Sequence, residues 1–257
     1  MLLTIAFISA TLMALRTKNT KDSIAQLKQN SPKAVQHNNG SLLYQYEGLA
    51  RFVSKRAYEG SLTYKQLLTN GGFGLAAADR LDGEVTILEG IVYQSKFDGQ
   101  TIILKPDDRT PFAFVTHFSP TITQSIEHID QRDLEKSLQS SFKDNEGIYA
   151  IKIEGKFKSL KLRSYSLIST PFPAFSEVVK NQSEYAMEEA HGTMVGFYIP
   201  NFLNGINVPG FHLHFLSRDR KTGGHLLNAY IQNGTVKLMP LEDGFTVKFS
   251  HKTFHNN

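Results

Sequence analysis

The sequence predicts an α+β fold with an α/β two-domain organisation, mixed and antiparallel β-sheets and only a few helices. Its 257 residues are enough for one large domain or two modest ones. Turn dipeptides such as Asp82-Gly83 and Asp98-Gly99 separate short runs rich in β-branched and aromatic residues, as expected of antiparallel strands. Helical patterns are few. We therefore expect an N-terminal α/β domain over residues 41–142 and a C-terminal β-rich domain over residues 143–257.

Residues 1–40 are expected to precede the fold as a signal peptide and a polar linker. The stretch MLLTIAFISATLMAL is apolar and is followed by Arg16, Lys18 and Lys21. Its length and position are typical of the apolar core of a secretory signal, and it is too short to span a bilayer. This predicts a secreted or periplasmic protein. Because no Lys or Arg precedes the stretch, the alternative is a buried N-terminal helix or strand in a cytoplasmic protein.

Three helices are expected in the N-terminal half of the chain. The first two cover residues 43–60 and 61–72, where Ser61 can cap the second helix and Gly71-Gly72 can end it. The third covers residues 121–142, because its apolar residues follow an approximate 3.6-residue period: Ile122, Ile126, Ile129, Leu134 and Leu138. Residues 81–104 are expected to form strands joined by hairpins.

The C-terminal half is expected to consist almost entirely of strands. The predicted strands cover residues 147–168, 191–199, 211–216, 225–232 and 235–239. The dipeptide Asn233-Gly234 is expected to join the last two strands as a hairpin turn.

Composition excludes several classes of function. The net charge is only +4, and Lys and Arg form no long run, so no nucleic-acid partner is expected. The chain has no Cys, which excludes disulfides, thiolate metal sites and a cysteine nucleophile. No membrane span is expected, since no apolar stretch is long enough.

The most informative segment is GFHLHFLSRDRKTGGHLLNAY, which spans residues 210–230. Side chains alternate between the two faces of a strand. The pattern FHLHF therefore places His212 and His214 on one face and three apolar side chains on the other, where they can pack into a core. The glycine-rich stretch that follows should turn the chain back into a partner strand.

A hairpin that pairs Ser217 with Thr222 would place His225 opposite His214. Three imidazoles would then converge, and three His ligands with an open fourth position describe a catalytic zinc site. The sequence thus predicts a zinc site on a β-hairpin of the C-terminal half, although cobalt, nickel or copper would also accept these ligands. The competing interpretation is an exposed strand face that happens to carry histidines. A cupin site would need a glutamate a few residues after His-x-His. Only Asp219 is found there, so a cupin site is disfavoured.

Three segments closely resemble the alpha-acetolactate decarboxylase family. They are YEGSLTYKQLLTNGGFGLAAADRLDGEVTILEGIVYQ, LKLRSYS and GTMVGFYIPNFLNGINVPGFHLHFLSRDRKTGGHLLNAYI, and the similarity runs from Tyr44 to Leu238. The resemblance implies a two-domain α/β enzyme, a homodimer, that converts 2-acetolactate to acetoin and carbon dioxide at a zinc ion. That reaction belongs to the formation of acetoin and butanediol.

The resemblance also implies roles for individual residues. His212, His214 and His225 match the three zinc ligands, Arg163 matches an arginine of the active site, and Glu84 matches an active-site carboxylate. Zinc would polarise the substrate ketone as a Lewis acid. Arg163 would pair with the substrate carboxylate, for which its planar fork is suited. Glu84 is the candidate to protonate the carbon that loses carbon dioxide.

The sequence departs from the family at two places. Ala77 stands where the family usually has threonine, and no acidic residue follows Asp243 where the family usually has a glutamate. The alternative function is therefore a metal- or ligand-binding relative that has lost turnover. A weaker alternative is a zinc hydrolase that activates water with the same three histidines.

Overall fold

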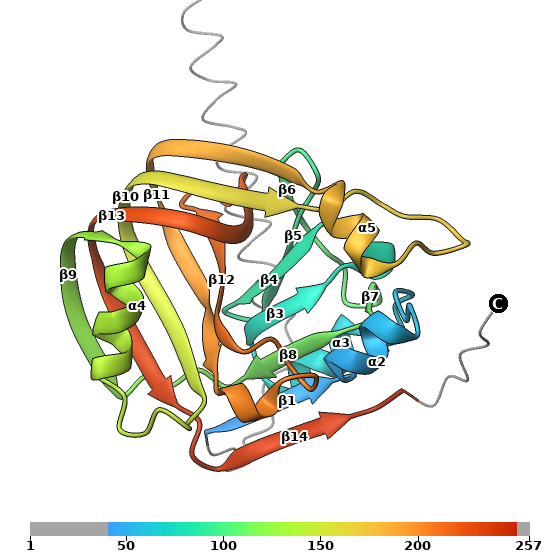
Figure 1. Cartoon of the computed structure of the whole chain (residues 1–257), viewed down its shortest axis with the longest axis horizontal. Coiled ribbons are helices and arrows are strands. Elements are labelled where there is room, and N and C mark those ends of the chain that lie inside the picture. The colour runs from blue at the N-terminus through green and yellow to red at the C-terminus, as the bar shows by residue number, and fades with distance from the viewer. Residues whose placement is uncertain (1–40, 251–257) are drawn as a thin grey trace, which may run out of the picture. The chain divides into compact units, whose positions relative to one another are not determined.

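The computed structural model describes residues 41–250, and the predicted signal peptide and linker lie outside this range. The described part consists mostly of strands with a few short helices, which agrees with the predicted α+β class with mixed and antiparallel sheets (Figure 1). No helix within residues 41–250 is long and apolar enough to cross a membrane.

The first sheet has seven strands in the order β14-β1-β8-β3-β4-β5-β6. Only β1 and β14 run parallel, and all other neighbours are antiparallel. The bounds are β1 Leu42–Tyr46, β3 Phe73–Ala77, β4 Glu84–Leu88, β5 Ile91–Ser95, β6 Thr101–Ile103, β8 Ala113–Thr116 and β14 Gly244–Lys248. A separate two-stranded sheet pairs β2 (Leu62–Thr63) with β7 (Arg109–Thr110).

The second sheet has five strands, β9 Ile122–Asp130, β10 Tyr149–Ser164, β11 Ser183–Ile199, β12 Gly210–Ser217 and β13 Gly223–Pro240. Figure 1 shows β10, β11 and β13 as long curved strands. Both β10 and β12 pair with β11 and with β13, so these four strands form a closed circuit. Strand β9 pairs with the later part of β13, on the edge opposite β10. The circuit encloses an apolar core that includes Phe157, Met194 and Phe215.

The helices are short and lie beside the sheets. The α-helices are α2 Leu49–Ser54, α3 Tyr64–Leu67, α4 Gln131–Ser140 and α5 Phe175–Lys180, and the 3-10 turns are η1 Leu68–Asn70, η2 Asp79–Leu81 and η3 Asn201–Leu203. Helix α4 contacts β9 and β13 and buries Leu134 and Leu138 in the core of the second sheet.

Each sheet takes strands from a different part of the chain. The first uses residues 42–116 together with β14, whereas the second uses residues 122–240. Strand β9 and helix α4 thus accompany the C-terminal strands, although they precede residue 143. The proposed division of the folded chain into two domains at residue 143 stays a prediction.

The predicted helix over residues 43–60 is wrong for its first part. Leu42–Tyr46 forms strand β1, and the helix α2 is confined to Leu49–Ser54. Glu47 adopts a positive φ of 68°, which interrupts any helix at that point. The predicted cap of the next helix is also displaced, because Thr63 and Gln66 form the capping box and Ser61 does not.

The predicted helix over residues 121–142 is half strand. Ile122–Asp130 forms β9 and pairs with β13, and Asp130 then caps α4 by accepting a hydrogen bond from the backbone of Asp133 at 2.9 Å. A spacing of four residues, as between Ile122 and Ile126, repeats on one face of a strand as well as of a helix. Pairing with β13 therefore decides a pattern that is ambiguous by itself.

The predicted hairpin turn at Asn233-Gly234 is also wrong. Strand β13 continues through both residues, with β10 on one side and β9 on the other. Gly155 of β10 lies opposite Gly234, and a Cβ atom added to Gly155 would lie 2.2 Å from the carbonyl oxygen of Asn233. These glycines therefore permit a close approach of two backbones instead of a turn.

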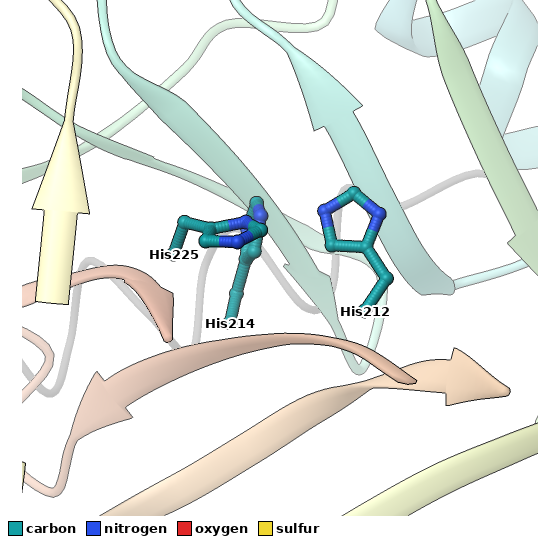
Figure 2. A group of neighbouring side chains, drawn as sticks. All are labelled: His212, His214 and His225. Atoms are coloured by element: carbon teal, nitrogen blue, oxygen red, sulfur yellow. The ribbon is translucent and has the colours of Figure 1, made fainter. Parts of the chain in front are cut away.

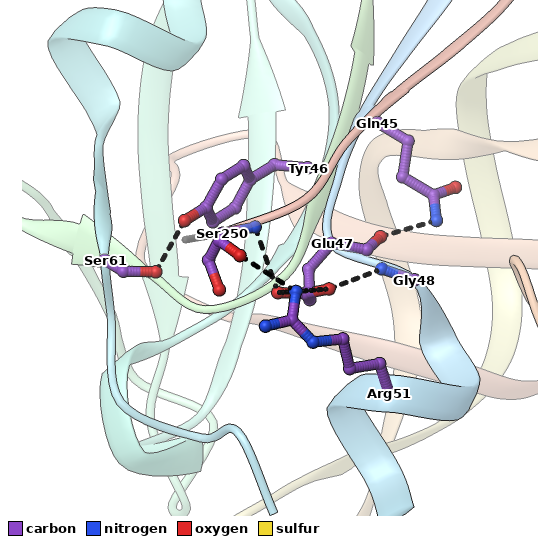
Figure 3. A network of polar contacts seen from close by, with 7 residues as sticks. All are labelled: Gln45, Tyr46, Glu47, Gly48, Arg51, Ser61 and Ser250. Atoms are coloured by element: carbon purple, nitrogen blue, oxygen red, sulfur yellow. Dashed lines mark hydrogen bonds and ion pairs between the residues drawn. The ribbon is translucent and has the colours of Figure 1, made fainter. Parts of the chain in front are cut away.

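An ion pair between the buried Glu47 and the partly exposed Arg51 connects the last described residues to the start of the first sheet (Figure 3). The Glu47 side chain is 1% exposed and accepts hydrogen bonds from Arg51 at 3.1 Å and from the backbone N–H groups of Gly48 and Ser250 at 3.2 and 3.3 Å. Arg51 in turn donates to the carbonyl oxygen of Ser250 at 3.0 Å. Glu47 and Arg51 thus bind the backbone N–H and the backbone carbonyl of Ser250, respectively.

We predict that Glu47→Ala lowers the free energy of unfolding by about 2–4 kcal/mol, because it leaves Arg51 and two backbone donors without their buried acceptor. Urea unfolding of the two proteins measures this difference. The matched control is Glu146→Ala at an exposed position, where a change within about 0.5 kcal/mol is expected. Equal stability of the two variants would contradict the role given to Glu47.

Candidate metal centre and active-site pocket

Three histidines come together where β12 and β13 meet. His214 lies opposite His225 in the antiparallel register, and the backbone N–H of Ser217 donates to the carbonyl of Thr222 at 2.8 Å. The register expected from the sequence is therefore confirmed. His212 precedes His214 by two residues and shares its face, while Leu213 and Phe215 on the opposite face belong to the core.

The three rings face a common space (Figure 2). Their centroids are 4.9 to 5.3 Å apart, and one possible ligand nitrogen from each ring lies within 4.8 Å of the other two. Nδ1 of His212, Nε2 of His214 and Nδ1 of His225 are buried without a hydrogen-bond partner among the described residues. Buried polar atoms without partners cost free energy. A metal ion that accepts imidazole nitrogens would remove this cost, so these residues fit such an ion.

Electrostatics keep the three imidazoles uncharged. Burial lowers the pKa of His212 to about 3, and the nearby Arg163 guanidinium adds to that effect. Burial first and the neighbouring His212 second also hold the pKa values of His214 and His225 well below the usual range. Neutral imidazole is the form that binds metals, so no proton has to be displaced near neutral pH.

The histidines line a cavity of about 420 Å³ that is bounded by both sheets. Its wall is mainly apolar and includes Leu49, Phe52, Leu75, Ala76, Phe112, Phe114, Phe175, Val179, Val208 and Leu227. The ionisable side chains on this wall are the three histidines, Glu84, Arg163 and Tyr165. A mainly apolar pocket with a few convergent polar groups and perturbed pKa values is typical of an active site.

A larger groove of about 1080 Å³ lies elsewhere on the described part and is a weaker candidate. Its lysines include Lys143, Lys152 and Lys237, and each pairs with a glutamate within 4 Å. None of its side chains belongs to a group of His and acidic residues that could hold a metal. The group of histidines that could hold a metal therefore lies in the smaller cavity.

Glu84 and Arg163 meet beside the histidines although 79 residues separate them in the chain. Nη1 of Arg163 donates to Oε1 of Glu84 at 3.0 Å, and Oε2 of Glu84 lies 3.6 Å from Nε2 of His214. Burial raises the pKa of Glu84, and the Arg163 guanidinium partly opposes this rise. Both residues that the resemblance selected thus lie in the pocket with the three histidines.

Two further side chains support this group and were not selected from the sequence. The hydroxyl of Thr86 lies 3.3 Å from Nδ1 of His214. The ring of Tyr165 lies 4.7 Å from the guanidinium carbon of Arg163, close enough for a cation–π contact. Thr86 lies two residues after Glu84 on the same strand, and Tyr165 lies two residues after Arg163. Alternation of side chains along a strand places Thr86 on the same face as Glu84, so this pattern could have found it.

Three neutral imidazoles that could hold a metal ion, together with the Arg163–Glu84 ion pair, are typical of an enzyme active site. Residues 43–257 match the family described as Alpha-acetolactate decarboxylase. Curated relatives of that name include those of Brevibacillus brevis, 36% identical over 87% of this chain and 79% of the relative, and Methanosarcina mazei, 33% identical over 85% and 76%. The crystal structure of the Bacillus subtilis strain 168 alpha-acetolactate decarboxylase superposes with a TM-score of 0.79 at 30% identity, covering 82% of this chain and 90% of that one.

The chain belongs to the alpha-acetolactate decarboxylase family, and the resemblance found in the sequence is confirmed. As a member of this family it is a carboxy-lyase.

The buried neutral histidines predict that the metal-free protein loses stability in acid. Unfolded histidine takes up a proton below a pH of about 6.5, whereas the folded chain keeps His212 neutral to about 3. Lowering the pH from about 7.5 to about 5 therefore favours the unfolded chain, by up to about 2 kcal/mol for each fully buried histidine. The raised pKa of Glu84 acts in the opposite sense, because the folded chain holds that proton to a higher pH.

Urea unfolding of metal-free protein at the two pH values measures this loss. We expect His214→Gln to reduce the loss, because it removes one buried group that only the unfolded chain protonates. His191→Gln should leave the loss unchanged, since His191 is exposed. A parent protein that is equally stable at both pH values would contradict the electrostatic account.

Proposed function

We propose that this chain catalyses the zinc-dependent decarboxylation of 2-acetolactate to acetoin and carbon dioxide, within the formation of acetoin and butanediol. The observation that carries the proposal is the pocket in which three partnerless imidazole nitrogens face a buried Arg–Glu pair. The names of the curated relatives supply the substrate.

In this proposal His212, His214 and His225 hold the metal. Three neutral imidazoles suit zinc and leave a coordination position for another ligand. When bound, zinc would polarise the substrate ketone and stabilise the negative charge that develops as carbon dioxide leaves. The remaining chemistry falls to the side chains around the metal site.

Arg163 is proposed to bind and orient the substrate carboxylate. Its guanidinium is held over the Tyr165 ring and already contacts one carboxylate, that of Glu84. A planar fork with several N–H donors can contact a second carboxylate without leaving the first. The substrate would thereby be fixed with its carboxylate against Arg163, and the C–C bond that breaks would lie near the histidines.

Glu84 is proposed to deliver the proton that completes the reaction. Loss of carbon dioxide leaves an enediolate, which becomes acetoin when its former carboxylate-bearing carbon gains a proton. Burial already favours the protonated form of Glu84, and Arg163 opposes it. A substrate carboxylate that shares the guanidinium would weaken that opposition and help Glu84 hold its proton at the carboxyl oxygen until transfer.

The apolar wall has two proposed roles. It offers contacts to the two methyl groups of 2-acetolactate, and it limits water around the developing charge. Ala77 belongs to this wall and lies opposite Glu84 in the β3–β4 register. The competing function, a metal-binding relative without turnover, is motivated by this alanine, because it brings no hydroxyl next to Glu84.

Two further proposals concern the whole protein. We expect a homodimer, as the family resemblance implies, and light scattering in solution tests it. We also expect export of the chain after cleavage of its N-terminal signal. The mass of the native protein tests this, and retention of Met1 or Leu2 on cytoplasmic protein would contradict it.

We predict that the purified chain binds one zinc ion and releases acetoin from 2-acetolactate, and that chelation abolishes acetoin release until zinc is restored. The double variant His212→Ala/His214→Ala should lose both zinc and turnover, because two of three ligands are removed. Elemental analysis and an acetoin assay measure the two quantities. Zinc that stays stoichiometric in the folded double variant would refute the ligand assignment, whereas zinc binding without acetoin would favour the relative that lacks turnover.

We predict that Arg163→Ala lowers kcat/KM for 2-acetolactate by about 10- to 200-fold while zinc content stays unchanged. A charge-assisted hydrogen bond to a carboxylate is worth about 1.5–3 kcal/mol, and about 1.4 kcal/mol corresponds to a tenfold change. Arg163→Lys should recover only part of the loss, because it keeps the charge without the fork.

Glu84→Gln is the matched variant for proton delivery, since it keeps the size of the side chain but carries no acidic proton. It should also reduce turnover with zinc retained. Normal turnover of Glu84→Gln would assign the proton to water or another group, and loss of zinc from Arg163→Ala would show that this arginine supports the metal site instead of the substrate.

A further inference from the structure

Thr86 is a buried hydroxyl residue of the first sheet that contacts a histidine of the second. It lies in the middle of β4, 0% exposed, two residues after Glu84 and therefore on the same face of the strand. Its Oγ1 lies 3.3 Å from Nδ1 of His214. None of the chemistry proposed above uses this contact.

The contact distinguishes His214 from the other two histidines. Nδ1 of His212 and Nδ1 of His225 are without hydrogen-bond partners among the described residues, whereas His214 has its partner at Nδ1 and leaves Nε2 without one. His214 is also the most buried of the three, with 1% of its surface exposed. It is therefore the ring of the three whose orientation is supported by a side-chain contact from the first sheet.

The direction of the hydrogen bond follows from the nitrogen that the metal would use. Nε2 of His214 has no hydrogen-bond partner among the described residues, and in the proposed metal centre its lone pair binds the ion. The ring proton then lies on Nδ1, and the Nδ1–H group donates to the Thr86 hydroxyl.

We infer that Thr86 is a positioning residue that holds His214 in the Nδ1–H tautomer, with Nε2 ready to bind the metal. This inference rests on the proposed metal centre. Ligating histidines in proteins generally donate their other ring N–H to a nearby acceptor, and removal of that acceptor weakens metal binding by about 10- to 100-fold. Thr86 lies on β4, so the strand that carries Glu84 also orients a ligand from β12. The first sheet thereby contributes to the affinity of a metal site whose ligands all lie on the second sheet.

The test compares the zinc dissociation constant of the full-length chain with those of Thr86→Val and Thr86→Ser, by competition with a chromophoric chelator. Valine keeps the shape of threonine but accepts no hydrogen bond, whereas serine keeps the hydroxyl. The matched control is Thr116→Val in the same sheet, which removes another 0% exposed hydroxyl, one that donates to the carbonyl of Leu42. His214→Ala reports the complete loss of this ligand.

We expect the dissociation constant of Thr86→Val to rise about 10- to 100-fold, as is usual when the acceptor of a ligating histidine is removed. Thr86→Ser and Thr116→Val should stay within about 3-fold of the parent. If Thr86→Val also stays within about 3-fold while His214→Ala loses zinc, the inference is wrong and the metal centre stands. If the parent itself binds no zinc, the metal centre is wrong and this inference with it.

A second measurement on the metal-free parent keeps the inference testable should Thr86→Val not fold. Long-range proton–nitrogen NMR correlations of the imidazole rings report which nitrogen carries the proton. We expect the His214 proton on Nδ1. A proton on Nε2 of His214 in the parent would overturn the inference.

Discussion

The site depends on one cross-strand pairing, that of His214 with His225. Because side chains alternate along a strand, a shift of one residue in the β12–β13 register would turn these rings to opposite faces. The register is held by the Ser217–Thr222 backbone hydrogen bond and by the burial of Leu213 and Phe215 on the other face. The same packing that builds the core of the second sheet therefore presents the imidazoles to the cavity.

Burial of imidazole nitrogens without hydrogen-bond partners costs free energy, and binding of a cation would recover it. Three imidazoles are buried with nitrogens that lack partners, next to a guanidinium that disfavours their protonation. Such a group is poorly suited to a stable core and well suited to a cation. The first sheet supplies a carboxylate and a hydroxyl group from one strand, since Glu84 pairs with Arg163 and Thr86 contacts His214. The pocket and its polar contacts thus arise where the two sheets meet.

Local sequence patterns predicted the parts of the site that lie on one hairpin. The alternation in FHLHF and the loop length fixed the faces and the pairing of His212, His214 and His225, and the structure agrees. Glu84 and Arg163 carry no such signal, because their contact joins residues 79 positions apart. Only the resemblance to a family selected them, and neither source selected Thr86.

The errors in the predicted fold also come from contacts between residues that are far apart in the sequence. The four-residue spacing of Ile122 and Ile126 fits one face of a helix and one face of a strand, and pairing with β13 selects the strand. Asn233-Gly234 has the composition of a turn, yet partners on both edges keep it extended. In both cases a neighbouring strand from a distant part of the sequence overrides the local preference.

The central claim is that one metal ion lies among the three imidazoles. Crystals of the zinc-loaded protein, measured at X-ray energies above and below the zinc absorption edge, test it most directly. The account predicts one anomalous peak within bonding distance of a nitrogen from each of His212, His214 and His225, about 2.0–2.1 Å for zinc. An anomalous peak at another location, or none between these rings in protein that binds zinc in solution, would contradict it.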